Sequence, residues 1–216
     1  MRLLLIRHAE SEGNAQGRLQ GRKEYPLSER GITQAAALAE RLATIPIAAI
    51  YASPIRRAHD TAEAVGNRVG LPVLSELRVQ EYDFGDKLSG LTWQEIRELH
   101  PDVVSTLVRG GAEFPTYPGE EGRDGFRDRV RAAITEITER HAGDESVAVV
   151  THAGPVIVYL MEVLGRAYSR PIPFTIDNAS ITTIEFSANP NPYQPPAVVT
   201  GINDTCHLTA RPAPSA

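Results

Sequence analysis

Two apolar segments, each followed at once by polar side chains, constrain the fold of this chain more than any other feature. Residues 3–6 are all Leu or Ile and run into Arg7 and His8, while the largely apolar segment Ser146–Thr151 runs into His152. Uninterrupted apolar segments of this length are typical of strands buried on both faces in the middle of a parallel sheet. In open α/β sheets, ligands bind outside the carboxyl ends of the strands. The two segments therefore predict a parallel sheet with a ligand site beside Arg7, His8 and His152.

The next part of the chain has the pattern of two helices. Ser28 has the position of an N-cap before an apolar stripe at helical spacing, formed by Ile32, Ala35, Ala36, Ala39 and Leu42. Ser53 has the same position before a second helix, with Pro54 as its first residue. We expect this second helix to end near Asn67.

Further helices and strands alternate along the rest of the chain. Thr92 and Glu95 have the spacing of a capping box, and the helix that they begin is expected to stop at Pro101. A longer amphipathic helix is marked by Phe126, Val130, Ala133, Ile134 and Ile137. The other strand candidates are residues 48–52, Val73–Ser75, Ile181–Phe186 and residues 198–202. This alternation predicts an α/β fold, a three-layer αβα sandwich with a mainly parallel central sheet and helices on both faces.

The length of 216 residues fits one domain, which we assign to residues 1–208, followed by a loose C-terminal tail at residues 209–216. Residues 109–124 are rich in Gly and Pro and include Phe114 and Tyr117. An irregular insertion near the site is therefore expected there. A hydrophobic content of 42% and a charged content of 23% allow a sizeable core.

Charge and cysteine content exclude several classes of function. A formal net charge of -5 argues against a global positive field, so we expect no nucleic-acid and no membrane partner. Cys206 is the only cysteine, which excludes an intrachain disulfide and a thiol-rich metal site and fits a reducing cytoplasm. No apolar segment precedes the first strand, so a signal peptide is not expected. Residues 146–165 are apolar, but His152 and Glu162 interrupt them, which favours strand, turn and buried helix over a membrane span.

Four separated segments resemble the motifs of a known family. Residues 7–14, with the sequence RHAESEGN, resemble the signature of the histidine phosphatase superfamily, the phosphoglycerate-mutase-like enzymes. Residues 53–58 (SPIRRA) resemble its second motif, residues 80–85 (QEYDFG) resemble the segment of its acid/base carboxylate, and residues 150–154 (VTHAG) resemble the motif of its second histidine. Residues 202–208 are similar to a tail found in several phosphatase members. The resemblance implies the phosphoglycerate mutase-like fold and membership in the phosphatase branch.

The resemblance also implies the residues of the site. The catalytic set comprises the nucleophile His8, the phosphate clamp Arg7 and Arg57, the acid/base Glu81 and the second histidine His152. Phosphate-binding residues would be Asn14, Gln20, Gly21 and Ala153. Ala9 stands where many members have Gly, a change between small residues that we expect the site to tolerate. After Gly85 the chain carries one residue more than many relatives, which leaves Asp83 as a weaker rival of Glu81 for the proton role.

These residue types suit phosphoryl transfer, in which charge spreads over three oxygens and catalysis depends on positioning and electrostatic stabilisation. Two arginines offer planar, bidentate donors, and they are expected to depress the pKa of His8 so that its attacking nitrogen is neutral near pH 7. Burial beside Tyr82 or Phe84 is expected to raise the pKa of Glu81, as a carboxyl that acts as an acid requires. The six histidines form no compact ligand motif, so we expect neither a metal site nor a cofactor.

The leading hypothesis is a cytoplasmic, metal-independent phosphatase that hydrolyses a small phosphomonoester through a phosphohistidine on His8, with Glu81 as general acid/base. A cofactor-dependent phosphoglycerate mutase would use the same pocket, but residues 109–123 contain only two Arg to hold a bisphosphate, which favours hydrolysis. A non-catalytic module that binds phosphate or a phosphoprotein is the alternative from another class, and the retention of both histidines, both arginines and Glu81 argues against it. The expected partner is a small phosphorylated metabolite, and a homodimer is left open.

Overall fold

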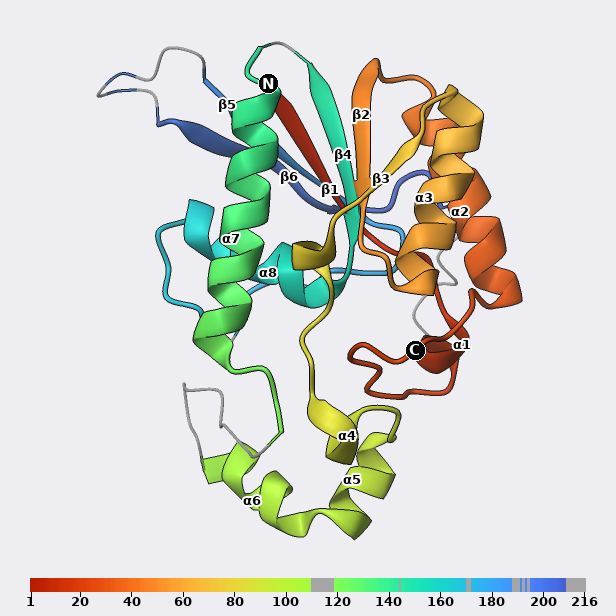
Figure 1. The fold of residues 1–216 in the computed structure, drawn as a ribbon, viewed down its shortest axis with the longest axis vertical. Coiled ribbons are helices and arrows are strands. Elements are labelled where there is room, and N and C mark those ends of the chain that lie inside the picture. The colour runs from red at the N-terminus through yellow and green to blue at the C-terminus, as the bar shows by residue number, and fades with distance from the viewer. Residues whose placement is uncertain are drawn as a thin grey trace, which may run out of the picture.

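A six-stranded sheet forms the centre of the molecule (Figure 1). The computed structural model describes residues 1–109, 119–143, 145–169, 172–187, 191, 193 and 195–208. The strands are β1 (Arg2–Arg7), β2 (Ile47–Ala52), β3 (Val73–Ser75), β4 (Ser146–Thr151), β5 (Ile181–Phe186) and β6 (Ala197–Asp204). Their order across the sheet is β3-β2-β4-β1-β5-β6. The first four are parallel, whereas β5 and β6 are antiparallel to their neighbours, so the expectation of a mainly parallel sheet is confirmed.

The register between β1 and β4 places the predicted site. Arg7 lies opposite Thr151 at the carboxyl ends of these two parallel strands. The residues that follow, His8 and His152, therefore leave the sheet side by side. A hydrogen bond from the His8 amide to the carbonyl oxygen of Thr151, 2.8 Å long, continues the pairing past the end of β1.

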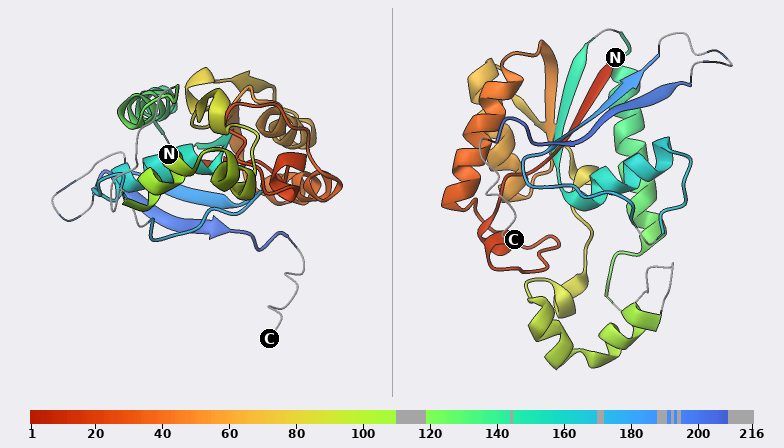
Figure 2. Two further views of the ribbon diagram at one scale, coloured as in Figure 1. Left: turned by 90° about the horizontal axis from the view of Figure 1, so that it is seen from below. Right: turned by 180° about the vertical axis from the view of Figure 1, so that it is seen from behind.

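Helices cover both faces of the sheet, which confirms the three-layer arrangement (Figures 1 and 2). They are α1 (Glu12–Ala15), α2 (Glu29–Leu42), α3 (Arg56–Val69), α4 (Gly85–Leu88), α5 (Trp93–Leu99), α6 (Pro101–Arg109), α7 (Arg123–Arg140) and α8 (Ala153–Val163). Alternate residues of β1 divide the core because strand side chains alternate between faces. Leu3 and Leu5 pack with α7 and α8 on one face, and Leu4 and Ile6 pack with α2 and α3 on the other. The short helices α4, α5 and α6 lie beyond the carboxyl edge of the sheet (Figure 1).

The N-cap of α2 is confirmed, but its buried face differs from the predicted stripe. Ser28 accepts a hydrogen bond from the Gly31 amide at 3.0 Å. Ile32 is 62% exposed and Ala36 is also exposed, so both were wrongly assigned to the core. Gly31 sets the rotation of the helix, because a Cβ there would lie 1.9 Å from the carbonyl oxygen of Glu10. The inward face consists of Gly31, Gln34, Ala35, Leu38, Ala39 and Leu42.

The start of α3 was wrongly predicted. The helix begins at Arg56 with Ile55 as its N-cap, and no side chain caps it. Ser53 instead turns its hydroxyl toward the Ile55 amide at 3.3 Å and toward His152. The helix runs two residues past the expected end near Asn67 and stops at Gly70, which has the left-handed φ of 76° that glycine adopts without strain.

The capping box of α5 is confirmed, and α6 was not expected. The Glu95 amide donates to the Thr92 hydroxyl at 3.2 Å, and the Thr92 amide donates to the Glu95 carboxylate at 2.7 Å. Pro101 ends α5 as predicted but is also the first residue of α6, a position where its missing N–H has no helical partner to lose. Of the predicted insertion at residues 109–124, the ends belong to α6 and α7, and residues 110–118 lie outside the described residues, as does the tail at 209–216.

The remaining predicted elements agree with the structure. All five apolar residues that marked the long helix are buried in α7. The apolar region at 146–165 forms β4 and α8, and within the described part of the chain no helix combines the length and the apolar character of a membrane span. Cys206 is free and exposed.

Candidate active site

The five predicted catalytic side chains meet at the carboxyl edge of the sheet. Arg7 and His8 lie at the end of β1, Arg57 in the first turn of α3, and His152 between β4 and α8. Glu81 comes from the loop that follows the 3-10 helix Leu77–Val79. The rings of His8 and His152 are 5.1 Å apart, edge to face, and both side chains are almost completely buried.

His8 is held as one tautomer. Its Nδ1 lies 2.7 Å from the carbonyl oxygen of Ala9, and since a carbonyl only accepts, Nδ1 carries the proton of the neutral ring. Its Nε2 accepts a hydrogen bond from Nε of Arg57 at 3.1 Å, so this nitrogen carries the lone pair. Burial, then the charges of Arg57 and Arg7, hold the pKa of His8 well below 6.5. The predicted effect of the guanidiniums is present, and burial is the larger cause.

Arg57 is fixed by the loop at residues 16–26. Its Nη2 donates to the carbonyl oxygen of Gly21 at 2.8 Å and its Nη1 to that of Lys23 at 2.9 Å. Burial lowers the pKa of Arg57 to about 10, an effect that the charge of Glu81 opposes. The guanidinium therefore stays charged at neutral pH beside the lone pair of His8.

The guanidinium of Arg7 is bonded through one nitrogen and has a second, buried donor without a described partner. Its Nη1 donates to the carbonyl oxygen of Ile176 at 2.5 Å, whereas its buried Nε has no hydrogen-bond partner among the described residues. Burial lowers the pKa of Arg7, and the charges of Glu81 and Asp177 oppose this change. Because a buried donor without a partner is costly, an oxygen-bearing ligand at this position would satisfy it.

His152 likewise has one ring nitrogen with a partner and one without a described partner. Its Nε2 lies 2.8 Å from the hydroxyl of Ser53, and its buried Nδ1 has no partner within the part of the chain that the structure describes. Burial, followed by the charge of Arg57, holds its pKa well below 6.5. Ser53 was not predicted as a site residue, because the pattern Ser-Pro before a helix also fits an N-cap.

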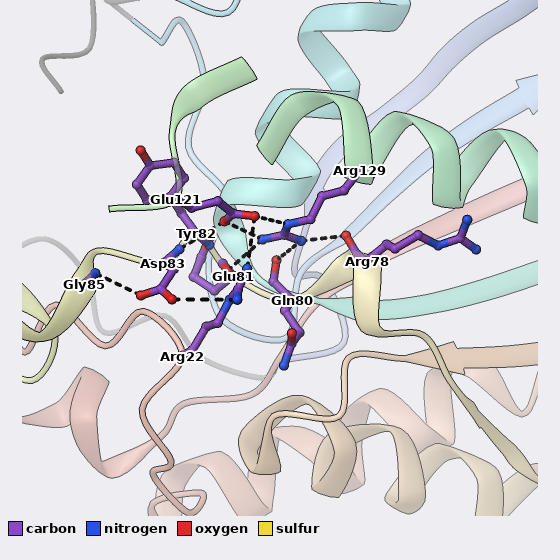
Figure 3. Close-up of polar contacts among 9 residues, drawn as sticks. All are labelled: Arg22, Arg78, Gln80, Glu81, Tyr82, Asp83, Gly85, Glu121 and Arg129. Carbon is purple, nitrogen blue, oxygen red and sulfur yellow. Dashed lines mark hydrogen bonds and ion pairs between the residues drawn. The ribbon is translucent and has the colours of Figure 1, made fainter. Parts of the chain in front are cut away.

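The carboxyl of Glu81 lies at the first turn of α8. Its Oε1 accepts from the Tyr82 amide at 2.8 Å and its Oε2 from the Gly154 amide at 3.3 Å. Burial raises the pKa of Glu81, although Arg57 and the Gly154 amide act in the opposite direction. Asp83 is directed elsewhere, since its Oδ1 accepts from the Gly85 amide at 2.9 Å and its Oδ2 lies 3.7 Å from Arg22 (Figure 3). This arrangement favours Glu81 over Asp83 for the proton role.

The four predicted phosphate-binding residues border the same place in different ways. Asn14 accepts through Oδ1 from the Asn178 side chain at 3.2 Å. Gln20 is buried beneath α1 and accepts from the Ser11 hydroxyl at 2.7 Å. Gly21 is tied to the site through its carbonyl oxygen, which accepts from Arg57. Ala153 is the first residue of α8, where helical N–H groups lack intrahelical partners and favour anions.

The loop before β5 supplies a support that the sequence did not indicate. The Asn178 side chain donates to the carbonyl oxygen of His8 at 3.1 Å and so links His8 to Asn14. Asn203, in the predicted tail motif, holds this loop by two bonds with Asp177, one to its amide at 2.6 Å and one to its carboxylate at 2.9 Å. The two contacts of Asn178 join residues 170 and 164 positions apart, separations at which periodicity gives no signal.

Among the residues that the structure describes, no group of three or more His, Cys, Asp or Glu side chains is placed to hold a metal ion. The site combines two buried guanidiniums, two neutral imidazoles and one carboxyl with a raised pKa. Such a set can bind an oxyanion, attack it through a nitrogen and transfer a proton.

Comparison with known proteins gives the family. Residues 3–193 match the family model described as histidine phosphatase superfamily (branch 1). This chain belongs to the histidine phosphatase superfamily. Phosphoserine phosphatase 1 of Hydrogenobacter thermophilus is 34% identical over 208 residues, which cover 96% of this chain and 94% of that relative. The metal-independent phosphoserine phosphatase of Arabidopsis thaliana is 36% identical over 154 residues, 70% of this chain and 64% of that relative.

The solved structure of Bacillus stearothermophilus YhfR superposes on this histidine phosphatase with a TM-score of 0.83 and 28% identity, covering 96% of this chain and 98% of YhfR. The expected family and fold are thereby confirmed. With relatives that are named phosphatases at this level of identity, the chain is a phosphomonoesterase.

Proposed function

We propose that this histidine phosphatase hydrolyses a small phosphomonoester without a metal ion, through a phosphohistidine formed on Nε2 of His8. One observation carries the proposal: Nε2 bears the lone pair of a buried neutral ring, and it lies against the buried cation Arg57. The nitrogens of Arg7 and His152 that have no hydrogen-bond partner among the described residues add support, because phosphoryl oxygens would be their acceptors.

In the first step Nε2 of His8 attacks phosphorus in line with the leaving oxygen. The N–P bond forms as the P–O bond breaks, while Arg7, Arg57 and His152 donate to the other phosphoryl oxygens. Glu81 gives its proton to the leaving oxygen, which departs as an alcohol. The raised pKa of Glu81 favours the protonated carboxyl that this step needs.

In the second step water attacks the phosphohistidine. The carboxylate of Glu81 accepts a proton from the water as the new P–O bond forms and the N–P bond breaks. Inorganic phosphate leaves, His8 regains its lone pair, and Glu81 is again protonated. Every group involved belongs to this chain, so no metal-bound water is required.

We infer a small phosphomonoester as substrate, and phosphoserine is the first compound to test. Two relatives named for phosphoserine phosphatase activity support this choice, and one of them is also named as metal-independent. Transfer back to the substrate, as in a phosphoglycerate mutase, and binding without turnover are the competing outcomes.

The test is an incubation of the purified protein with EDTA and a panel that contains phosphoserine, 3-phosphoglycerate and p-nitrophenyl phosphate. Released phosphate and 2-phosphoglycerate are measured in the same samples. We expect phosphate release that survives EDTA and is lost in His8→Ala, while His59→Ala, a change at a partly exposed side chain on α3 that pairs with Glu63, keeps it. Formation of 2-phosphoglycerate would instead identify a mutase, and no product at all would identify a binding module.

A further inference from the structure

One guanidinium holds the backbone of the loop that carries Glu81 (Figure 3). Arg129, in α7, donates through Nη1 to the carbonyl oxygens of Arg78 at 2.6 Å and Gln80 at 2.8 Å. Through Nη2 it donates to the carbonyl oxygen of Glu81 itself at 3.0 Å. Backbone carbonyls that are not paired within a helix or a sheet need other donors. Here one guanidinium donates to three such carbonyls. The peptide groups on both sides of Glu81 are thus tied to the same residue.

Glu121 fixes this guanidinium from the opposite side. Its carboxylate pairs with Nε of Arg129 and accepts from Nη2 at 2.9 Å. The two side chains are only 16% and 13% exposed, so the pair is largely shielded from water. The guanidinium also lies 4.8 Å above the ring of Phe126. Arg129 is therefore held in one position by contacts that do not include the loop it supports.

The same carboxylate connects the two sides of the site. Glu121 lies 3.0 Å from Arg22, the residue after Gly21, whose carbonyl accepts from Arg57. The Glu121 amide donates to the carbonyl oxygen of Asp83 at 3.0 Å, and the Asp83 amide donates to the Glu121 carboxylate at 3.2 Å. A continuous set of contacts thus runs from the loop that holds Arg57, through Glu121, to the loop that holds Glu81.

From this geometry we propose that Arg129 and Glu121 are positioning residues for proton transfer: they set the peptide groups around Glu81 so that its carboxyl lies where the leaving oxygen is protonated. Among the described residues, the carboxyl itself accepts from the amides of Tyr82 and Gly154. A loop released from Arg129 moves the carboxyl relative to the phosphoryl site. A displacement of about 1 Å is enough to cost roughly 100-fold in rate.

The role presupposes that Glu81 is the acid of the proposed function, and the test uses esters that differ in their need for that acid. Phenyl phosphate has a poor leaving group that requires protonation, whereas 2,4-dinitrophenyl phosphate has a leaving group that departs unprotonated. The ratio kcat/KM covers the steps up to phosphoenzyme formation, so it isolates this difference. We expect Arg129→Lys, which keeps the charge but not the fork of donors, to lose about 100-fold on phenyl phosphate and less than about 5-fold on the dinitrophenyl ester.

Glu121→Gln is the second variant, because it preserves shape and removes only the charge that orients Arg129. The same selective loss is expected, smaller in size. Arg131→Lys is the matched control, two residues further along α7 and half exposed, where its ion pair with Asp128 lies on the surface. It should keep both activities.

Equal losses on the two esters, or full activity on phenyl phosphate, would overturn the positioning role. If Arg129→Lys does not fold, the result for Glu121→Gln decides the question alone. Glu81→Gln separates this inference from the proposed function. An equal loss of activity on both esters in Glu81→Gln would contradict the acid role itself. A selective loss on phenyl phosphate in Glu81→Gln that is not seen in Arg129→Lys or Glu121→Gln would contradict only the positioning role.

Discussion

Nε of Arg57 donates to Nε2 of His8 across 3.1 Å, and both side chains are buried. The nitrogen proposed as the nucleophile is thus capped by a donor in the free protein. Under the proposed mechanism, we expect this lone pair to become available when the guanidinium donates to a phosphoryl oxygen instead of the ring. Substrate binding would then also activate His8.

This contact predicts the protonation behaviour of His8. In the folded protein we expect His8 to remain neutral, with its proton on Nδ1, as the pH falls below 6.5, because burial and two guanidiniums lower its pKa. Arg57→Gln should raise that pKa by removing one of these charges. Imidazole nitrogen NMR over a pH titration measures both effects, and Arg56→Gln, at an exposed neighbouring residue paired with Asp60, is the control. Protonation of wild-type His8 at its ordinary pKa would contradict the assignment.

The double role proposed for Glu81 predicts a trapped intermediate. In Glu81→Gln, 2,4-dinitrophenyl phosphate should still phosphorylate His8, since its leaving group needs no acid. Hydrolysis of the phosphohistidine should slow by about 100-fold or more, because the water has lost its base. We expect a burst of dinitrophenolate together with one equivalent of acid-labile phosphoenzyme. Neither should form in the double variant Glu81→Gln/His8→Ala.

Gly154→Ala should displace the carboxyl of Glu81 without changing its chemical identity. A Cβ at this position would lie 2.1 Å from Oε1 of Glu81 and 3.0 Å from the Phe126 ring. We expect kcat on phenyl phosphate to fall by about 10- to 100-fold, in line with the cost of misplacing a catalytic group. Gly125→Ala is the matched control, because a Cβ there would meet no described atom within 4 Å. It should keep full activity and stabilise α7 by up to about 1 kcal/mol; equal activities of the two variants would refute the steric argument.

Stability should depend on pH through the two buried imidazoles. The pKa values of His8 and His152 in the folded state lie well below 6.5, mainly because of burial. Below pH 6.5 the unfolded chain binds protons on both rings while the folded chain does not, so their contribution to stability is complete above 6.5 and is lost as the pH falls. Each ring should cost about 1 kcal/mol of unfolding free energy over the first pH unit below its ordinary pKa. Urea unfolding at several pH values measures this dependence. In His152→Asn the unfolding free energy should fall less steeply with decreasing pH than in the wild type, and an identical dependence would contradict the prediction.

Asn203 offers a test of the support beneath Arg7. Its bonds to Asp177 hold the loop whose Ile176 carbonyl accepts from Arg7. Asn203→Gly keeps the backbone φ of 56° free of strain but removes both bonds. We expect a raised KM for p-nitrophenyl phosphate and weaker inhibition by inorganic phosphate. Asn203→Ala should share this phenotype and unfold more easily than the Gly variant by about 1 kcal/mol, owing to the left-handed conformation; an unchanged KM in both would argue against the support.

Local patterns in the sequence were sufficient to predict the sheet strands and most helices. The bounds of β3, β4 and β5 agree with the predicted segments, and the buried residues of α7 follow from their helical spacing. In α2 the spacing was misassigned because a close approach between Gly31 and the Glu10 backbone, not hydrophobicity, sets the rotation of the helix. Such an approach depends on tertiary contact and leaves no periodic trace.

The site residues were predicted from the motifs, whereas the residues that hold them in place were not. Arg129 bonds to the Glu81 carbonyl from 48 positions away, and Ser53 reaches His152 across 99 positions. In the sequence Arg129 is one of several arginines on a helix, where the usual expectation is a solvated surface charge. Only the fold distinguishes it from Arg127 or Arg131, which pair with acidic neighbours on the same helix.

The position of β1 has a consequence for synthesis of the chain. This strand is made first, yet it lies between β4 and β5, with Arg2 opposite Ser146 and Glu185. At about 5–20 residues per second, roughly 7–30 s pass between the translation of β1 and that of its first partner. During that interval the four consecutive aliphatic side chains of β1 have no native strand to join, which leaves an apolar segment open to non-native contacts until β4 has been made.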